Sequence, residues 1–347
     1  MAPVTHVQSG LEQTDTFVVN KNGELTVRWA TGKNPWQGPA SIGANLFPPS
    51  APLAASIQFG APQQTDVFGV TKNGKLAVAW VTGTNPWSGP AEIFDGGYEP
   101  GAPVAASRQF GIDNQTDLFA VNKNGELTVS WVTGTGNWQG PHSLTHGGYP
   151  SKAWVAASQR FGRDTTDVYA VDNEGALTVH SVDGKNPWGG LVRLSPPGTF
   201  VPGSPLAAGQ QFGLTQTDVF VVDKSGALTV TWFDGSKWQG PERITPSNTF
   251  PAGASVATSR QFDRDQTDVF VVDNKGALTV TYVEGAGVWQ ETQSISHPGF
   301  ATPSARLTAG RQFGVSQQTD VFVQTGDGQL HVFWVTAGGP WSGPAGI

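Results

Sequence analysis

One tripeptide recurs seven times along the chain and sets the frame of the whole sequence. All but one copy read Gln-Thr-Asp, and the exception is Thr165-Thr166-Asp167. The seven aspartates are Asp15, Asp66, Asp117, Asp167, Asp218, Asp268 and Asp320. Successive copies are 51, 51, 50, 51, 50 and 52 residues apart. Self-similarity at a fixed period of this size is typical of a repeat array.

Each repeat contains four β-prone segments separated by turn residues. An Ala-rich segment such as 104–111 is followed by a continuous apolar segment such as 216–222, an alternating one such as 226–232, and a fourth that opens on tryptophan, such as 238–244. Asn-Gly pairs such as Asn73-Gly74 separate the second and third segments, and this is a strong hairpin signal. The repeat therefore predicts a four-stranded antiparallel meander.

Four-stranded units at this period are typical of propeller blades. The second segment is apolar at consecutive positions, which indicates a strand buried on both faces within a stack of sheets. We therefore expect an all-β, seven-bladed β-propeller with four antiparallel strands in each blade. We expect a single domain, 1–347, with blades at approximately 1–46, 47–97, 98–148, 149–199, 200–249, 250–299 and 300–347. Because the first and last repeats begin and end at nearly the same point of the four-segment unit, ring closure is expected to rely on packing between blades.

Composition excludes several functional classes. The net charge of −7 and the scattered 20 Lys and Arg argue against nucleic acid, which needs a basic stripe. The absence of cysteine removes disulfides and thiolate metal sites. No signal peptide or apolar span is visible, so we expect no membrane insertion. We expect a soluble protein that is cytoplasmic or released by a route without a signal peptide.

A meander sorts its connections onto two faces. The turns between the first and second and between the third and fourth strands share one face. A tryptophan recurs there, and flat aromatic faces pack against sugar rings while Arg and amide groups orient hydroxyls. The alternative is that these indoles only fill gaps between blades. The candidate residues on this face are Trp36, Trp87, Trp138, Trp188, Trp238, Trp289 and Trp341, with Arg108, Gln109, Arg260, Gln261, Arg311 and Gln312 at the ends of first strands.

The opposite face carries the crossovers between blades, and each crossover contains an aromatic residue. A groove there would be an inter-blade site, whereas the alternative is an apolar anchor that pins the crossover. The crossover candidates for sugar binding are Tyr98, Tyr149, Phe200, Phe250 and Phe300, and Phe47 belongs to the same series.

Other recurrent residues favour architecture. The third-strand tryptophans Trp29, Trp80, Trp131, Trp232 and Trp334 are expected to pack within the blades, with Ser181 and Tyr282 at the equivalent places. The repeated aspartates are expected to bond neighbouring strands or turns. No catalytic motif appears, the histidines share no repeat phase, and no metal or other cofactor is expected.

The segments 266–273 and 276–281, followed by a Trp-led fourth strand, resemble the repeats of the Photorhabdus seven-bladed propeller lectins over essentially the whole chain. This resemblance implies metal-free binding of fucose and related or O-methylated sugars between blades, fucosylated glycoconjugates as partners, and frequent assembly into homo-oligomers. Three departures weaken individual sites: blade 1 lacks Gln-Phe-Gly, Arg160 replaces a recurrent Gln, and Glu291-Thr292 replaces Gly-Pro.

Two functions remain open. A multivalent lectin gains avidity from repeated weak sites, and near-identical repeats suit it. A protein-interaction scaffold would carry varied loops and one dominant patch. An enzyme acting on glycans is less favoured, because a glycosidase needs two carboxylates at a defined separation, so we expect no catalysis.

Overall fold

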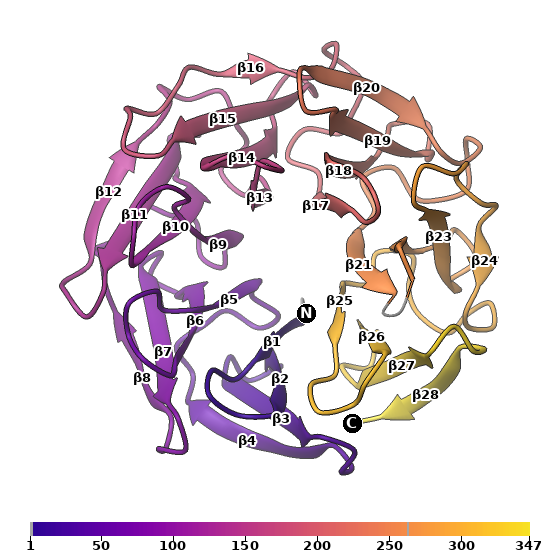
Figure 1. The fold of residues 1–347 in the computed structure, drawn as a ribbon. Coiled ribbons are helices and arrows are strands. Elements are labelled where there is room, and N and C mark those ends of the chain that lie inside the picture. Colours follow the sequence, from indigo (N-terminus) through magenta and orange to yellow (C-terminus); the bar gives the residue numbers. More distant parts are fainter. Residues whose placement is uncertain (1–2, 262–263) are drawn as a thin grey trace.

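Seven four-stranded antiparallel sheets stand in a ring around a central axis (Figure 1). The computed structural model describes residues 3–261 and 264–347, and within these ranges every regular element is a strand. Each sheet uses four consecutive strands in chain order, so the predicted seven-bladed propeller of antiparallel meanders is confirmed. The chain begins near this axis and ends at the outer edge of the last blade.

The strand bounds follow the repeat. Blades 1 to 4 contain β1 (Val4–Val7), β2 (Gln13–Val19), β3 (Leu25–Thr31), β4 (Gln37–Gly43), β5 (Leu53–Ile57), β6 (Gln64–Val70), β7 (Leu76–Thr82), β8 (Ser88–Glu92), β9 (Val104–Arg108), β10 (Gln115–Val121), β11 (Leu127–Thr133), β12 (Gln139–Ser143), β13 (Val155–Gln159), β14 (Thr165–Val171), β15 (Leu177–Asp183) and β16 (Val192–Arg193). Blades 5 to 7 contain β17 (Ala207–Gln211), β18 (Gln216–Val222), β19 (Leu228–Phe233), β20 (Trp238–Arg243), β21 (Ala257–Gln261), β22 (Gln266–Val272), β23 (Leu278–Glu284), β24 (Gln293–Ser294), β25 (Leu307–Arg311), β26 (Gln318–Gln324), β27 (Leu330–Thr336) and β28 (Ser342–Gly346).

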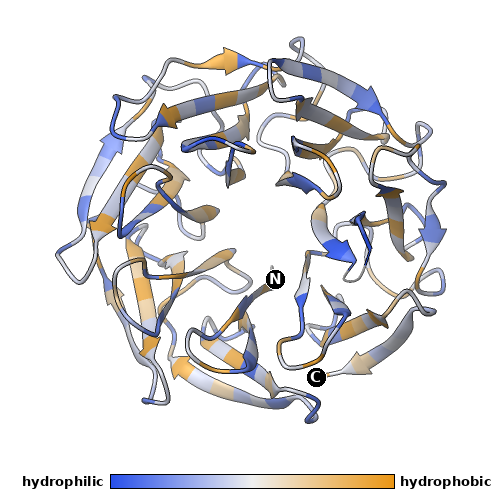
Figure 2. Ribbon diagram, viewed as in Figure 1, coloured by the Kyte–Doolittle hydropathy of each residue, from blue (hydrophilic) through white to orange (hydrophobic). Residues whose placement is uncertain are grey.

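The core lies between blades. The second strand of each blade is buried almost throughout, as its continuous apolar sequence predicts, because it packs against a sheet on either side. Phe17 of blade 1, for example, packs in one cluster with Val67 of blade 2. In Figure 2 the hydrophobic colour recurs along strands such as β7 and β11, whereas much of outer β12 and β24 is hydrophilic. The inter-blade core thus holds the ring together.

Ring closure involves no exchange of strands. Blade 1 is built from β1–β4 and blade 7 from β25–β28, each from one continuous stretch of chain. The expectation that closure relies on packing is therefore confirmed. The fourth strand shortens to two residues in blades 4 and 6, the two blades whose Trp-led segment lacks Gly-Pro.

Candidate functional site

Hydrogen bonds confirm how the connections are divided between the two faces. On one face, the crossover residue Phe47 donates its backbone N–H to Gly23 O in the turn between β2 and β3, at 3.2 Å. On the other face, Gln8 at the end of the first strand donates Nε2 to Gly83 O, at 2.6 Å. Gly83 begins the turn between the third and fourth strands of blade 2. Each face therefore joins neighbouring blades by its own set of bonds.

The glutamine and aspartate of the recurrent tripeptide form a hydrogen-bonded chain. Gln13 Nε2 donates to Asp15 Oδ1 at 2.8 Å and to Gln8 Oε1 at 2.7 Å. Gln8 in turn holds the tryptophan-bearing turn of blade 2. The whole chain of bonds recurs in blades 2, 3, 5 and 7, and blade 6 has its two bonds within the blade. The tripeptide therefore helps to position the next blade's turn.

The threonine of the tripeptide points the other way, toward the preceding blade. Thr116 Oγ1 accepts the backbone N–H of Phe59 at 2.9 Å. The corresponding bond is made by Thr14, Thr65, Thr166, Thr217 and Thr267. Successive side chains of a strand alternate between its faces, so one tripeptide contacts both neighbours.

Each aspartate of the full tripeptide keeps one carboxylate oxygen without a hydrogen-bond partner. Asp15, Asp66, Asp117, Asp218, Asp268 and Asp320 are at most 1% exposed, and their Oδ2 atoms are buried and unpartnered among the described residues. Burial raises the pKa of these six carboxyls to about 7, and the Gln bond offsets only part of this. A carboxyl desolvated in this way favours its neutral form.

Blade 4 is different because Arg160 replaces the recurrent glutamine. Its Nε and Nη2 donate to Asp167 Oδ2 and Oδ1 at 2.9 and 2.7 Å, and Nη2 also donates to Ser181 Oγ at 2.8 Å. Ser181 stands where most blades carry the third-strand tryptophan. The guanidinium lies over the rings of Phe233 and Trp238 of blade 5, 4.7 and 5.8 Å from their centroids. Arginine thus occupies the space between blades 4 and 5.

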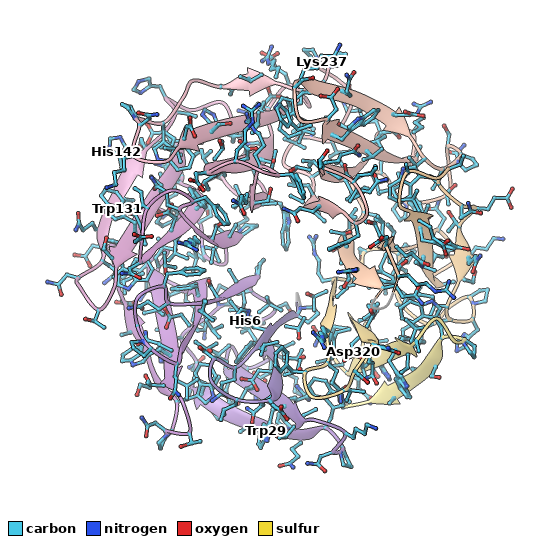
Figure 3. The ribbon with its side chains drawn as sticks, viewed as in Figure 1. His6, Trp29, Trp131, His142, Lys237 and Asp320 are labelled. Carbon is cyan, nitrogen blue, oxygen red and sulfur yellow. The ribbon has the colours of Figure 1, made fainter. Side chains whose placement is uncertain are left out.

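At two other junctions the equivalent space is an open pocket lined by two tryptophans. Between blades 1 and 2 a pocket of about 310 Å³ is lined by Trp29 of β3, Trp87 of blade 2, Gln8 and Gln13. Between blades 7 and 1, a pocket of about 620 Å³ is lined by Trp334, Trp36, Gln312, Gln318 and Asp320, among others. Figure 3 labels Trp29 and Asp320 on the two blades beside the ring closure.

The turn tryptophans both fill the junction and face its pocket. Trp87 packs edge-on against Phe17 of the preceding blade, with centroids 5.3 Å apart. The other six do the same with the equivalent Phe or Tyr, at 5.3 to 5.8 Å. Their rings remain half-buried. Each indole therefore packs into the junction with one part of its surface and faces the pocket with another, so the packing alternative does not exclude the binding prediction.

The other predicted site residues of this face lie in two places. Gln109, Gln261 and Gln312 are buried in the Gln–Asp chain, and Gln312 also lines the pocket between blades 7 and 1. Arg108, Arg260 and Arg311 lie over Phe59, Phe212 and Phe313 at the turns after first strands.

The crossover aromatics are mostly buried plugs. Tyr98, Tyr149, Phe200 and Phe250 are at most 2% exposed and offer no ring face to a ligand here, and Phe300 is half-buried. Tyr98 Oη also bonds Thr128 Oγ1 at 2.9 Å, inside the junction.

Sequence reasoning missed the third-strand tryptophans as pocket residues. Trp29 and Trp334 pack against the core, as expected, but they also line the pockets. The available signal was their register: Trp29 pairs with Asp15 and Trp334 with Asp320, so indole and carboxyl share one face of the sheet.

The pockets combine apolar indole faces with amide groups, a combination suited to binding a polar ring that has an apolar face. Among the described residues, no group of three His, Asp or Glu side chains could hold a metal ion. His142 lies on β12 at the outer rim (Figure 3). No helix that could cross a membrane is found in the described part of the chain. Fold and pockets together define a repeated small-ligand-binding propeller.

Comparison with known proteins identifies the family. No family model and no curated relative matches the chain. The solved BP39L lectin of Burkholderia pseudomallei is 48% identical, with a TM-score of 0.98 over 99% of this chain and 98% of that one. The chain therefore belongs to the family of this propeller lectin.

More distant lectins share the propeller fold. The Aleuria aurantia lectin, solved with α-methyl-L-fucoside, is 22% identical, with a TM-score of 0.56 over 85% of this chain and 95% of that one. The lectin SapL1, solved with α-methyl fucoside, is 18% identical, with a TM-score of 0.56 over 86% and 97%. At this identity the likeness concerns the fold alone.

Proposed function

We propose that this protein is a multivalent lectin that binds fucose or related, including O-methylated, sugars in the tryptophan pockets between blades, without catalysis and without a metal. The observation that carries this proposal is the pairing of two indoles from neighbouring blades, Trp29 with Trp87 and Trp334 with Trp36, above glutamine side chains. Membership of a lectin family supports it. The fucosides bound to the Aleuria lectin and SapL1 suggest the sugar class.

The chemistry of the pocket suits a neutral sugar. Indole faces stack on the C–H face or methyl group of a pyranose, and amides can meet its hydroxyls. The carboxyl at the pocket floor is buried and favours its neutral form, so it supplies no exposed nucleophile or base. A glycosidase would need two carboxylates flanking the scissile bond. This arrangement supports binding without hydrolysis.

The number of sites is set by the repeat. Six junctions combine the two glutamines and the aspartate with a third-strand Trp or, in blade 6, Tyr282. The junction between blades 4 and 5 has Arg160 and Ser181 instead, and the guanidinium fills the space. We therefore propose six working sites in each chain. Repetition raises avidity for fucosylated surfaces through effective concentration, without any new contact.

Calorimetric titration of free L-fucose into the wild type and three tryptophan variants tests the proposal. Trp87→Ala and Trp138→Ala should each remove about one site and leave affinity at the distant sites nearly unchanged. Trp238→Ala is the matched control, because Trp238 packs against Tyr169 as Trp87 packs against Phe17 but faces the junction filled by Arg160. It should leave the stoichiometry unchanged.

Thermal unfolding of each variant confirms that the fold survives. Equal stoichiometry in wild type, Trp87→Ala and Trp138→Ala would exclude the tryptophan pockets and shift the proposal to the crossover face. A wild type that binds no sugar on a glycan array would favour the protein-interaction scaffold.

A further inference from the structure

The crossover face of five junctions is closed by the buried aromatic of the crossover itself, and at the junction of blades 6 and 7 the crossover aromatic Phe300 is half-buried. Tyr98 and Tyr149 reach into the junction, and their hydroxyls bond Thr128 and Thr178 of the following blade at 2.9 and 2.8 Å. Phe47, Phe200 and Phe250 are equally buried. These aromatic side chains fill the junction on this face.

The junction between blades 7 and 1 has no such plug among the described residues. A pocket of about 590 Å³ opens there instead. It is lined by Asn20, Lys21, Asn22 and Arg28 of blade 1, and by 327–329 and 346–347 of blade 7. The pocket lies by the turns between second and third strands, and it adjoins the Trp334–Trp36 pocket, with which it shares Gly346 and Ile347.

Two positions in the walls of this junction are polar where the other six junctions have aliphatic residues, and the position of Arg28 holds no charged residue in the other blades, where it is Ala79, Ser130, His180, Thr231, Thr281 or Phe333. Thr16 and Arg28 pair across β2 and β3 and face blade 7, since Thr14 and Val18 on the same side of β2 contact that blade. Gln324 faces blade 1, as Phe322 does. The positions of Thr16 and Gln324 are aliphatic in every other blade: Val67, Leu118, Val168, Val219, Val269 and Val321 for the first, and Val19, Val70, Val121, Val171, Val222 and Val272 for the second.

Arg28 makes no ion pair with any described residue, although the Asp327 carboxylate lines the same pocket. Its Nε and Nη1 atoms, and Thr16 Oγ1, are buried without a hydrogen-bond partner among the described residues. Burial lowers the pKa of the guanidinium, as expected for a cation removed from water. The carboxylate of Asp327 accepts bonds from Thr325 Oγ1 and Gln329 N, at 2.6 and 3.2 Å. A partly buried charge without a partner is unfavourable, so the pocket favours an anion.

We propose that this pocket is a second ligand site, specific to the closure junction, that binds the carboxylate of an acidic sugar through Arg28. A guanidinium binds a carboxylate with two parallel hydrogen bonds, and this planar geometry distinguishes it from a hydroxyl. Lys21 adds a positive charge at the rim, and the amides of Asn22 and Gln329 are available to sugar hydroxyls. The site differs from the tryptophan pockets in ligand charge and in copy number.

Calorimetric titration with D-galacturonate, and with D-galactose as the neutral counterpart, tests the proposal. The wild type should bind about one galacturonate per chain at this site, with an affinity that falls as salt is added, and galactose should not compete. Arg28→Gln should weaken galacturonate binding at least tenfold. Arg243→Gln is the matched control, because it removes an equal charge far from this pocket, from an exposed arginine that pairs with the buried Asp223 in blade 5, and it should not change galacturonate binding.

A second variant distinguishes loss of the Arg28 site from loss of the fold. Thr16→Val with Arg28→Ala gives this junction the residues that blade 2 has in Val67 and Ala79, so it should fold and still lose galacturonate binding. Fucose titration of the same variants should be unchanged, which separates this proposal from that for the tryptophan pockets. No galacturonate binding, equal binding by Arg28→Gln or by the double variant, or equal binding of galactose would overturn it.

Discussion

Replacement of Asp66 by asparagine removes one of the six buried carboxyls while keeping its size and its acceptor for Gln64. In the folded protein the Asp66 side chain is fully buried, only Oδ1 receives a hydrogen bond, and desolvation raises its pKa from 3.8 to about 7. The folded state therefore binds a proton more tightly than the unfolded chain does. The stabilisation from that proton is complete below about pH 4 and is lost as the pH rises to about 7.

The size of the effect follows from the pKa difference. A gap of about three pKa units, at about 1.4 kcal/mol each, gives about 4 kcal/mol as the upper limit for one carboxyl. Denaturant unfolding at pH 4, 5, 6, 7 and 8 measures it. Wild-type stability should fall from pH 4 to pH 7, and the stability of Asp66→Asn should fall less steeply. The variant should be close to the wild type at pH 4 and more stable than it at pH 8.

Asp167→Asn is the matched comparison, because Arg160 already neutralises this carboxylate. Removing the charge leaves a buried guanidinium unpaired, which should cost about 3–5 kcal/mol at pH 8. The two substitutions should therefore act with opposite signs at that pH. Identical pH profiles for Asp66→Asn and the wild type, or stabilisation by Asp167→Asn at pH 8, would refute the reasoning.

Three further predictions concern the junctions. Thr116→Val removes the acceptor of the Phe59 N–H and should lower the free energy of unfolding by about 1–3 kcal/mol; an unchanged denaturation midpoint would contradict the role of the tripeptide threonine. Gly74→Ala should lower the melting temperature far more than Gly96→Ala. Both glycines have positive φ, but a Cβ at Gly74 would clash with Tyr98 O, whereas no atom lies within 4 Å of a Cβ at Gly96. The cost at Gly96 should therefore be only the backbone strain of about 1 kcal/mol. EDTA should change neither fucose affinity nor melting temperature, and loss of binding restored by calcium would contradict metal-free recognition.

The sequence was sufficient to predict the blade count, the strand order and the face of each connection. These follow from periodicity: Asn-Gly turns fix hairpins, and a doubly apolar second strand can only lie between sheets. The aspartate's architectural role was predictable in part. Seven copies fit a repeated framework, but in six blades the carboxylate bonds the glutamine two residues earlier in its own strand, and not a neighbouring strand or turn as expected.

Which side chains of two neighbouring blades meet in each junction could not be predicted. Whether Trp29 and Trp87 meet depends on the packing angle between separate sheets, and no local pattern encodes it. The same holds for Arg160, because its filling of the junction is evident only from its contacts with Asp167, Ser181 and Trp238. The polarity of the closure junction required comparison of Thr16, Arg28 and Gln324 with their equivalents in the other blades, on faces known only from the fold.

A crystal structure of the protein soaked with α-methyl-L-fucoside tests the central claim most directly. The account predicts sugar density between Trp29 and Trp87 and between Trp334 and Trp36, with the ring stacked on indole and its hydroxyls toward the glutamines. It predicts no sugar at the junction of blades 4 and 5, where Arg160 fills the space. Sugar on the crossover face alone, or at the Arg160 junction as often as at the others, would contradict it.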